Sequence, residues 1–269
     1  MTQHNRSIKA ALDFTARFGF VTQSIFFNYL CPRQKTQQYL HWGELICEGL
    51  LAPSKARADV CYLTKAGRRR GSQPAVPSRS IYFVEHDAMV AEFYLELLKS
   101  GLVAESWTAY ELSKEPWKAC GLLGCGDLIK IPDLVVELKS KTGTMRIAFE
   151  MERSRKTNFR YDQMAINYWG FKRVNLLLVS CVNAATRRAI ERAFNAPLYR
   201  DAEKSPALFL ANEFNGSKME ATAYFDGAKL SLKKLLLAAL EMETWGATEN
   251  PENLRKPFRK NLKDKKAYA

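Results

Sequence analysis

The chain has 269 residues, of which 47% are hydrophobic and 12% aromatic, enough apolar material for two modest folded domains. This composition excludes a disordered polymer, and a net charge of +13 with an isoelectric point near 9.5 indicates a polyanionic partner, most commonly nucleic acid. The polar N-terminus lacks the apolar core of a secretion signal, and no apolar run is as long as a membrane span, so we expect a cytoplasmic protein.

The N-terminal region has the pattern of three helices followed by a hairpin. Apolar residues recur at near-helical spacing over about 7–17 and again over 21–30, and a third helix is expected over about 33–49. Residues 50–64 are predicted to form two strands around a basic connector, ending at the basic run 65–70. This is the pattern of a winged helix-turn-helix domain, whose third helix enters the major groove of DNA. The alternative is a small helical protein-interaction domain.

The third helix is expected to face DNA with its polar side chains, including His41, and to face inward with Tyr39, Leu40, Leu45 and Ile46. Glutamine, lysine and arginine are the residue types that read base edges or hold phosphates. The side chains predicted to contact DNA are Arg33, Lys35, Gln37, Gln38, Lys55, Arg57, Arg68 and Arg69.

Changes in composition divide the rest of the chain. Residues 1–72 form the predicted winged-helix domain, and 73–80 are rich in Pro and Ser, as is typical of a linker. A second domain is expected over 81–245, followed by a Lys/Arg-rich tail over 246–269 that we interpret as flexible and attracted to phosphate.

The second domain is predicted to follow the order α-β-β-β-α-β-α-β around a mixed sheet. The continuous apolar run 174–182 is typical of a fully buried central strand. The other expected elements are a helix over 85–99, a strand over 107–112, a loop around 116–126, a hairpin over 131–152, helices over 159–169 and 184–194, a strand over 207–211, and a last strand and helix within 218–240.

The hairpin contains carboxylates. Its two strands, 131–138 and 144–152, alternate β-branched and aromatic residues with other types, and a short polar turn separates them. Glu150 and Glu152 share one face of the second strand, because successive side chains of a strand point to opposite sides.

The register decides which glutamate faces Asp133. A turn centred between residues 141 and 142 places Asp133 opposite Glu150, and a turn centred one residue later places it opposite Glu152. Three carboxylates that converge repel one another, so such a site usually contains a cation, and these hard oxygen ligands suit Mg²⁺ or Mn²⁺. The competing interpretation is that Glu-x-Glu marks the solvated outer face of an ordinary strand.

The six cysteines show neither Cys-x-x-Cys nor Cys/His ligand spacing, so we expect neither a zinc site nor a disulfide framework. Buried, reduced thiols are the simplest interpretation.

The element order, with Pro-Asp on the second strand and Glu-x-Glu on the third, resembles the PD-(D/E)xK nuclease superfamily, the fold of many restriction enzymes. With the predicted winged helix in front, the chain up to about residue 245 resembles the replication-relaxation proteins and, within them, the MobC class of plasmid relaxases. The resemblance implies an α/β protein with an N-terminal winged helix and a restriction-endonuclease-like mixed-sheet domain. It also implies that Asp133, Glu150 and Glu152 are catalytic metal ligands for Mg²⁺ or Mn²⁺.

One position departs from the superfamily pattern. The superfamily commonly has Lys two residues after the first Glu, where this chain has Glu152, so another cation must supply that role or it is absent. Lys156, the predicted catalytic cation, and Arg155 are close in sequence; their alternative interpretation is solvated charge at a helix start. Polar residues Tyr161 and Gln163 lie on the following helix, where packing is the default interpretation.

The function implied by the resemblance is that of a plasmid mobilization relaxase, a metal-dependent endonuclease that nicks one DNA strand at an origin of transfer. The implied partners are origin-of-transfer DNA and a mobilization accessory or coupling protein of a type IV secretion system. A tyrosine nucleophile stays open, because 11 tyrosines are available, whereas His4, His41 and His86 are too dispersed for a histidine-cluster relaxase. The alternatives are a non-catalytic DNA-binding accessory or regulator with a nuclease-like scaffold, and a restriction-type enzyme that cuts both strands.

Overall fold

The computed structural model describes residues 3–72, 75–115, 131–140, 143–195 and 205–240. By their internal contacts the residues divide into two compact units, Met1–Leu95 and Glu96–Ala269. The division falls inside the helix α5 (Val84–Lys99), so the first unit contains the predicted linker and most of this helix. The predicted loop around 116–126 and the predicted tail 246–269 lie outside the described residues.

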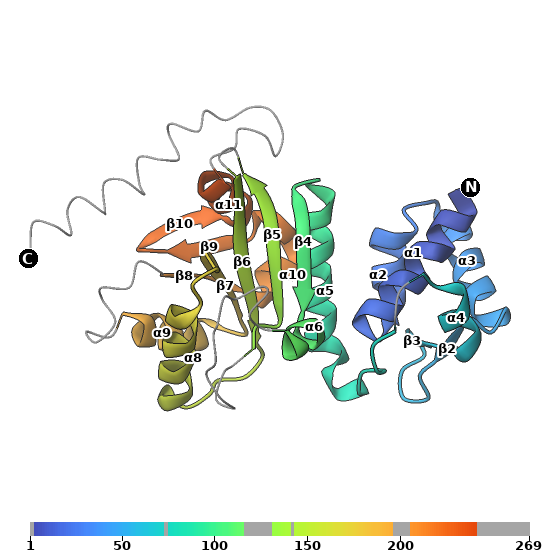
Figure 1. Ribbon diagram of the computed structural model, residues 1–269, viewed down its shortest axis with the longest axis horizontal. Helices are drawn as coiled ribbons and strands as arrows, with labels where there is room; N and C mark the ends of the chain where they lie inside the picture. The colour runs from blue at the N-terminus through green and yellow to red at the C-terminus, as the bar shows by residue number, and fades with distance from the viewer. Residues whose placement is uncertain (1–2, 73–74, 116–130, 141–142, 196–204, 241–269) are drawn as a thin grey trace, which may run out of the picture. The chain divides into compact units, whose positions relative to one another are not determined.

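The first unit combines helices with a small sheet (Figure 1). The central strand β3 pairs antiparallel with β1 on one side and with β2 on the other, so the strand order is β1-β3-β2. In chain order the elements are α1 (Gln3–Phe18), β1 (Val21–Thr22), α2 (Gln23–Ile25), the π-helix η1 (Phe26–Leu30), α3 (Lys35–Cys47), β2 (Leu51–Pro53), β3 (Val60–Leu63), α4 (Lys65–Arg70) and the 3₁₀ turn η2 (Ile81–Phe83), followed by α5.

An apolar core holds the first unit together. Phe20 and Phe26 are fully buried, and each such side chain removed from water contributes about 1.5–3 kcal/mol. Gly67 in α4 fits closely against the start of β2, because an added Cβ would lie 2.1 Å from the carbonyl oxygen of Leu50. A side chain at this position would therefore push α4 off the hairpin.

The second unit is built on a seven-stranded mixed sheet of order β10-β9-β8-β7-β6-β5-β4 (Figure 1). Strands β4, β5 and β6 form an antiparallel meander, and β6, β7 and β8 run parallel. The elements are β4 (Val103–Thr108), α6 (Ala109–Lys114), β5 (Leu134–Ser140), β6 (Gly143–Glu152), α8 (Asn158–Gly170), β7 (Leu176–Cys181), α9 (Ala184–Phe194), β8 (Pro206–Leu210), α10 (Ala211–Ser217), η4 (Lys218–Glu220), β9 (Thr222–Phe225), β10 (Ala228–Ser231) and α11 (Leu232–Leu240).

Each face of this sheet is covered by apolar packing. On one face, Ala148 of β6 belongs to a buried cluster with Tyr161 and Met164 of α8 and with residues of α9. On the other face, the ring of Phe149 in β6 stacks on that of Phe209 in β8, with centroids 6.1 Å apart. A strand with both faces covered is apolar throughout, and β7, whose residues are all buried, occupies the central position predicted for it.

Two predictions about the second unit are wrong. The strand expected over 107–112 ends at Thr108, because Thr108 caps α6 through a reciprocal capping box with Glu111. The region 218–240 contains two strands rather than one, and its hairpin β9–β10 turns at Asp226 and Gly227, both with positive φ. In the parts of the chain that the structure describes, no helix is long and apolar enough to cross a membrane.

Candidate functional site

The hairpin of β5 and β6 has the first of the two registers considered from the sequence. Leu134 pairs with Phe149 and Ser140 with Gly143, which centres the turn between residues 141 and 142. Asp133, immediately before β5, therefore comes next to Glu150 on the neighbouring strand. Its Oδ2 also accepts a hydrogen bond of 2.8 Å from the backbone N–H of Met151.

Glu150 and Glu152 are both buried, with 1% of their surface exposed. This burial rules out the interpretation of Glu-x-Glu as a solvated strand face. Burying a carboxylate is costly unless it is hydrogen-bonded or paired with a cation. Glu150 accepts a 2.6 Å hydrogen bond from the hydroxyl of Tyr168, and Glu152 lies 2.7 Å from the ammonium group of Lys156.

The sheet topology gathers these groups at one edge. Strands β6, β7 and β8 are parallel, so their carboxyl ends meet, with Glu152 of β6 beside Cys181 of β7. Because β5 is antiparallel to β6, its first residues reach the same edge and bring Asp133 there. The carboxyl ends of parallel strands are where open α/β sheets commonly bind ligands.

Helix α8 supports this edge through two tyrosines. Tyr161 and Tyr168, two turns apart on one helix face, are both buried against the sheet. The Tyr161 hydroxyl accepts a 2.9 Å hydrogen bond from the backbone N–H of Lys156, and burial raises the pKa of this phenol. Lys156 is thus fixed at its backbone by α8 and at its ammonium group by Glu152.

Sequence reasoning did not assign Tyr168 to the site. The available signal was its spacing of seven residues from Tyr161, which places both on the helix face that packs on the sheet. Gln163, one of the polar residues noted on this helix, is half-buried. Among the buried residues near the edge, Cys181 stays a thiol, because burial and the neighbouring Glu152 raise its pKa to about 12.

The donor set has the chemistry that Mg²⁺ or Mn²⁺ prefers, since Asp133, Glu150 and Glu152 offer carboxylate oxygens. In the structure one oxygen of each carboxylate is engaged by the protein, through Met151, Tyr168 and Lys156 respectively. Across the described ranges, no group of three or more His, Cys, Asp and Glu side chains is arranged to hold a metal ion. The metal site stays a prediction.

Helix α3 is rotated relative to its predicted orientation. Its buried positions are 38, 41, 42 and 45, at the spacing of one helix face, so Gln38 and His41 point inward and not toward solvent. Tyr39 and Leu40, predicted to face inward, are 57% and 59% exposed. Trp42, which was not assigned to the core, fills the inner face in their place.

Gln38 has a structural role, which corrects its assignment to DNA binding. Its amide donates hydrogen bonds to the carbonyl oxygens of Phe27 and Cys31, at 2.8 and 3.0 Å, and so satisfies backbone groups at the end of η1. His41 is equally internal, with Nδ1 3.5 Å from the sulfur of Cys31.

The other predicted DNA contacts of the first unit differ in exposure. Arg33 is half-buried, and Arg57 is held by a bidentate pair with Asp59, at 2.7 and 3.2 Å, which raises the pKa of Arg57 and lowers that of Asp59. The exposed members are Lys35, Gln37, Lys55, Arg68 and Arg69, the last two on α4.

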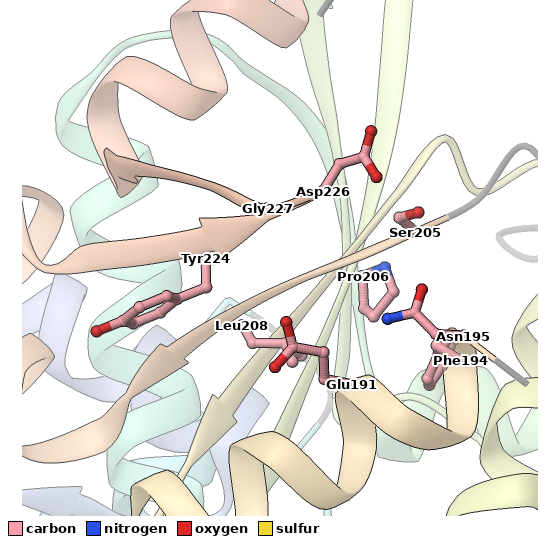
Figure 2. A pocket seen from close by; sticks show the side chains of 9 residues that line it. All are labelled: Glu191, Phe194, Asn195, Ser205, Pro206, Leu208, Tyr224, Asp226 and Gly227. Carbon is pink, nitrogen blue, oxygen red and sulfur yellow. The ribbon is translucent and has the colours of Figure 1, made fainter. Parts of the chain in front are cut away.

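A small pocket of about 60 Å³ lies elsewhere in the second unit, at the amino end of β8 (Figure 2). Its walls include Glu191 of α9, Asn195 directly after that helix, Pro206 of β8 and Tyr224 of β9. The carboxylate groups lie at the opposite edge, where the parallel strands end. No sequence motif pointed to this pocket.

Comparisons with models of known protein families, with curated proteins and with solved structures find no match for this chain.

Proposed function

We propose that this protein is a metal-dependent DNA endonuclease that nicks one strand at a plasmid origin of transfer. The observation that carries the proposal is the ion pair of the buried Glu152 with the partly exposed Lys156, next to the buried Glu150, at the carboxyl edge of a mixed sheet. A protein that needed only a stable sheet would have apolar residues here, because buried ionised groups are costly to maintain. Strained or costly arrangements of this kind are expected at functional sites.

The order of elements supports the nuclease interpretation of the second unit. A meander of three antiparallel strands is followed by a helix and by a strand parallel to the third, with Pro132-Asp133 before the second strand and Glu-x-Glu at the end of the third. Lys156 supplies the cation missing from the usual motif position, because its ammonium group reaches Glu152 from the segment that follows β6. Its alternative interpretation, a solvated charge at a helix start, fits this contact less well.

The first unit supports DNA binding. Its helices precede a two-stranded hairpin, and β1 pairs with the second hairpin strand, as expected of a winged helix. The exposed Lys35 and Gln37 on α3 and Lys55 between the hairpin strands offer groups for bases and phosphates. This unit would select the DNA site, and the second unit would cut it.

In the proposed reaction a water oxygen attacks the phosphorus of the scissile phosphodiester, and the bond from phosphorus to the leaving oxygen breaks. The water loses a proton to solvent, and the leaving oxygen gains one. Asp133, Glu150 and Glu152 would hold Mg²⁺ or Mn²⁺, which supplies charge neutralisation and water activation when bound. Lys156 orients the water or protonates the leaving oxygen, while Tyr168 fixes the rotamer of Glu150.

The second candidate is a DNA-binding accessory or regulatory protein with no catalytic activity. It is favoured by the fact that Asp133, Glu150 and Glu152 each already bond to a group of this chain. In that case the carboxylates would connect β5, β6 and α8, and DNA binding would be the whole activity. A mobilization accessory or coupling protein of a type IV secretion system is a proposed partner for both candidates.

The two candidates differ in a nicking assay. Supercoiled plasmid carrying the cognate transfer origin is incubated with the native protein in Mg²⁺, in Mn²⁺ and in EDTA. Conversion to open circles with either metal, absent in EDTA, supports the endonuclease. Sequence-specific binding without nicking in any metal supports the accessory protein and overturns the endonuclease proposal.

A further inference from the structure

An exposed aromatic ring lies among cations directly after the carboxylate strand. Phe159, in the first turn of α8, is 70% exposed. Phenylalanine is usually buried, and an exposed aromatic ring among cations is the combination with which proteins bind unpaired nucleic-acid strands. Arg153, Arg155 and Arg160 are exposed on either side of it, and the first turn of α8 contains no acidic residue.

The position of this segment is tied to the candidate site. Lys156 contacts Glu152 through its ammonium group and α8 through its backbone N–H, so the chain between β6 and α8 is held at the carboxyl edge. Phe159 is three positions after Lys156, and a chain of that length spans about 11 Å at most. The backbone of Phe159 therefore lies within that reach of the segment that follows β6.

Val182 extends the same surface. It follows β7, it is exposed, and its backbone N–H donates a 3.0 Å hydrogen bond to the carbonyl oxygen of Glu152. Arg192 of α9 adds another exposed cation, and its guanidinium bonds the side chain of Asn158 at 2.8 Å. Val182 and the exposed arginines that follow β6 thus adjoin the carboxyl edge of the sheet, where the buried carboxylates lie.

We propose that the segment 153–160 binds an unpaired DNA strand, with Phe159 stacked on one base and the arginines on the phosphates. The inference rests on the proposed function for its choice of DNA. Aromatic rings that lie among cations are how proteins hold single strands, because every unpaired base offers a free π-face. A paired base keeps both faces stacked inside the duplex, so a protruding ring gains less from intact DNA.

The nicking substrate would then be a locally melted strand. The arginines attract the phosphate backbone of the DNA, and the Phe159 ring holds one base in place. The position of that base determines which phosphate lies at Glu152 and Lys156. Phe159 is a positioning residue in this account.

The test is fluorescence anisotropy in EDTA, with labelled single-stranded and duplex oligonucleotides of one mixed sequence. Phe159→Ala should weaken single-strand binding about tenfold, the loss expected for one stacked base, and weaken duplex binding much less. Phe159→Trp should retain single-strand affinity, because it keeps a stacking ring. The matched control is Ile166→Ala, which removes another apolar side chain of α8 that is 41% exposed, and it should change neither affinity.

Three outcomes overturn the inference: unchanged single-strand binding by Phe159→Ala, equal losses for single strand and duplex, or a larger loss of binding to anionic lipid vesicles than to single strands. Nicking by the native protein is scored in parallel to separate this inference from the function it rests on. If the native protein nicks and Phe159→Ala leaves single-strand binding unchanged, the stacking inference is overturned and the endonuclease proposal is retained. A selective single-strand loss without any nicking retains the binding surface and overturns the endonuclease.

Discussion

Removing the Tyr168 hydroxyl isolates the contribution of α8 to the carboxylate edge. Tyr168→Phe keeps the ring, which packs edge-on against Phe171 with centroids 4.8 Å apart, and deletes only the donor to Glu150. A hydrogen bond to a charged group contributes about 1.5–3 kcal/mol, and a buried acceptor that loses its donor costs a similar amount. Both side chains are almost fully buried, so water cannot replace the hydroxyl without rearrangement.

We therefore expect Tyr168→Phe to lower the free energy of unfolding by about 2 kcal/mol, or roughly 1 M in urea midpoint at a typical slope. Unfolding is followed by tryptophan fluorescence, to which Trp169 of α8, packed against Phe194, contributes with the other four tryptophans of the chain. The control is Tyr224→Phe in the same unit, a half-buried tyrosine whose ring lies under Arg187. A midpoint for Tyr168→Phe no lower than that of the control would refute the reasoning.

A double-mutant cycle makes the assignment specific. Glu150→Ala combined with Tyr168→Phe should cost less than the sum of the single changes, because both remove the same interaction. Strictly additive losses would show that the two side chains act independently.

Three further predictions follow from the same contacts. Lys156→Met should destabilise the protein by about 1–2 kcal/mol in urea unfolding, because it leaves Glu152 buried without its cation and the partial exposure of Lys156 limits the loss. Adding Glu152→Gln should recover most of this stability, and no recovery would argue against the ion pair. Gln38→Ala should lower the free energy of unfolding by about 1–3 kcal/mol, because its two hydrogen bonds to backbone carbonyls are lost. The exposed control Gln37→Ala should leave stability unchanged, and equal effects of the two changes would contradict the observed rotation of α3. Burial raises the pKa of Cys61 to about 11 and of Cys181 to about 12, so a thiol reagent at pH 8 should modify the exposed Cys47 but neither of these, as located by mass spectrometry; fast labelling of Cys181 would show that the carboxyl edge of the sheet opens. The raised pKa values contribute stability that is fully present below the unfolded pKa of about 8.5 and is lost as the pH rises toward the folded values.

Much of the second unit could be predicted because its elements are strongly periodic or continuously apolar. The run that becomes β7 has no polar face, and Ala184–Phe194 coincides with the predicted helix. The sequence left two registers open for the carboxylates, because it did not fix the turn centre; the structure has the first of them. The predicted strand over 107–112 was wrong because Thr108 and Glu111 cap a helix at a place where β propensity alone favours a continued strand.

The rotation of α3 could not be predicted because polarity was a misleading guide. Gln38 and His41 are polar, yet backbone carbonyls at the end of η1 and the sulfur of Cys31 satisfy them inside the core. Tyr39 and Leu40 are apolar, yet Trp42 and Leu45 already fill the inner face. Which set of residues turns inward depends on partners that are distant in the sequence, and these become visible only when the fold is known.

The burial of the two glutamates could not be predicted from the sequence either. Glu150 and Glu152 could be placed on one face of a strand, but whether that face is exposed to solvent depends on the packing of α8 over it. The Tyr168 contact and the reach of Lys156 both come from this packing. Helix α8 was expected at the right place, but not as the cover of the carboxylates.

The most direct test of the central claim is the initial rate of plasmid nicking by Glu150→Gln, compared with the native protein in Mg²⁺ or Mn²⁺. Glutamine keeps the shape of the side chain and an oxygen for the Tyr168 hydroxyl, so the fold and DNA affinity should be retained. The matched control is Glu191→Gln, on α9 beside the pocket at the amino end of β8. Catalysis at the carboxylate edge predicts a loss of at least about a hundredfold for Glu150→Gln and none for the control. Native nicking rates in a folded Glu150→Gln protein would contradict it.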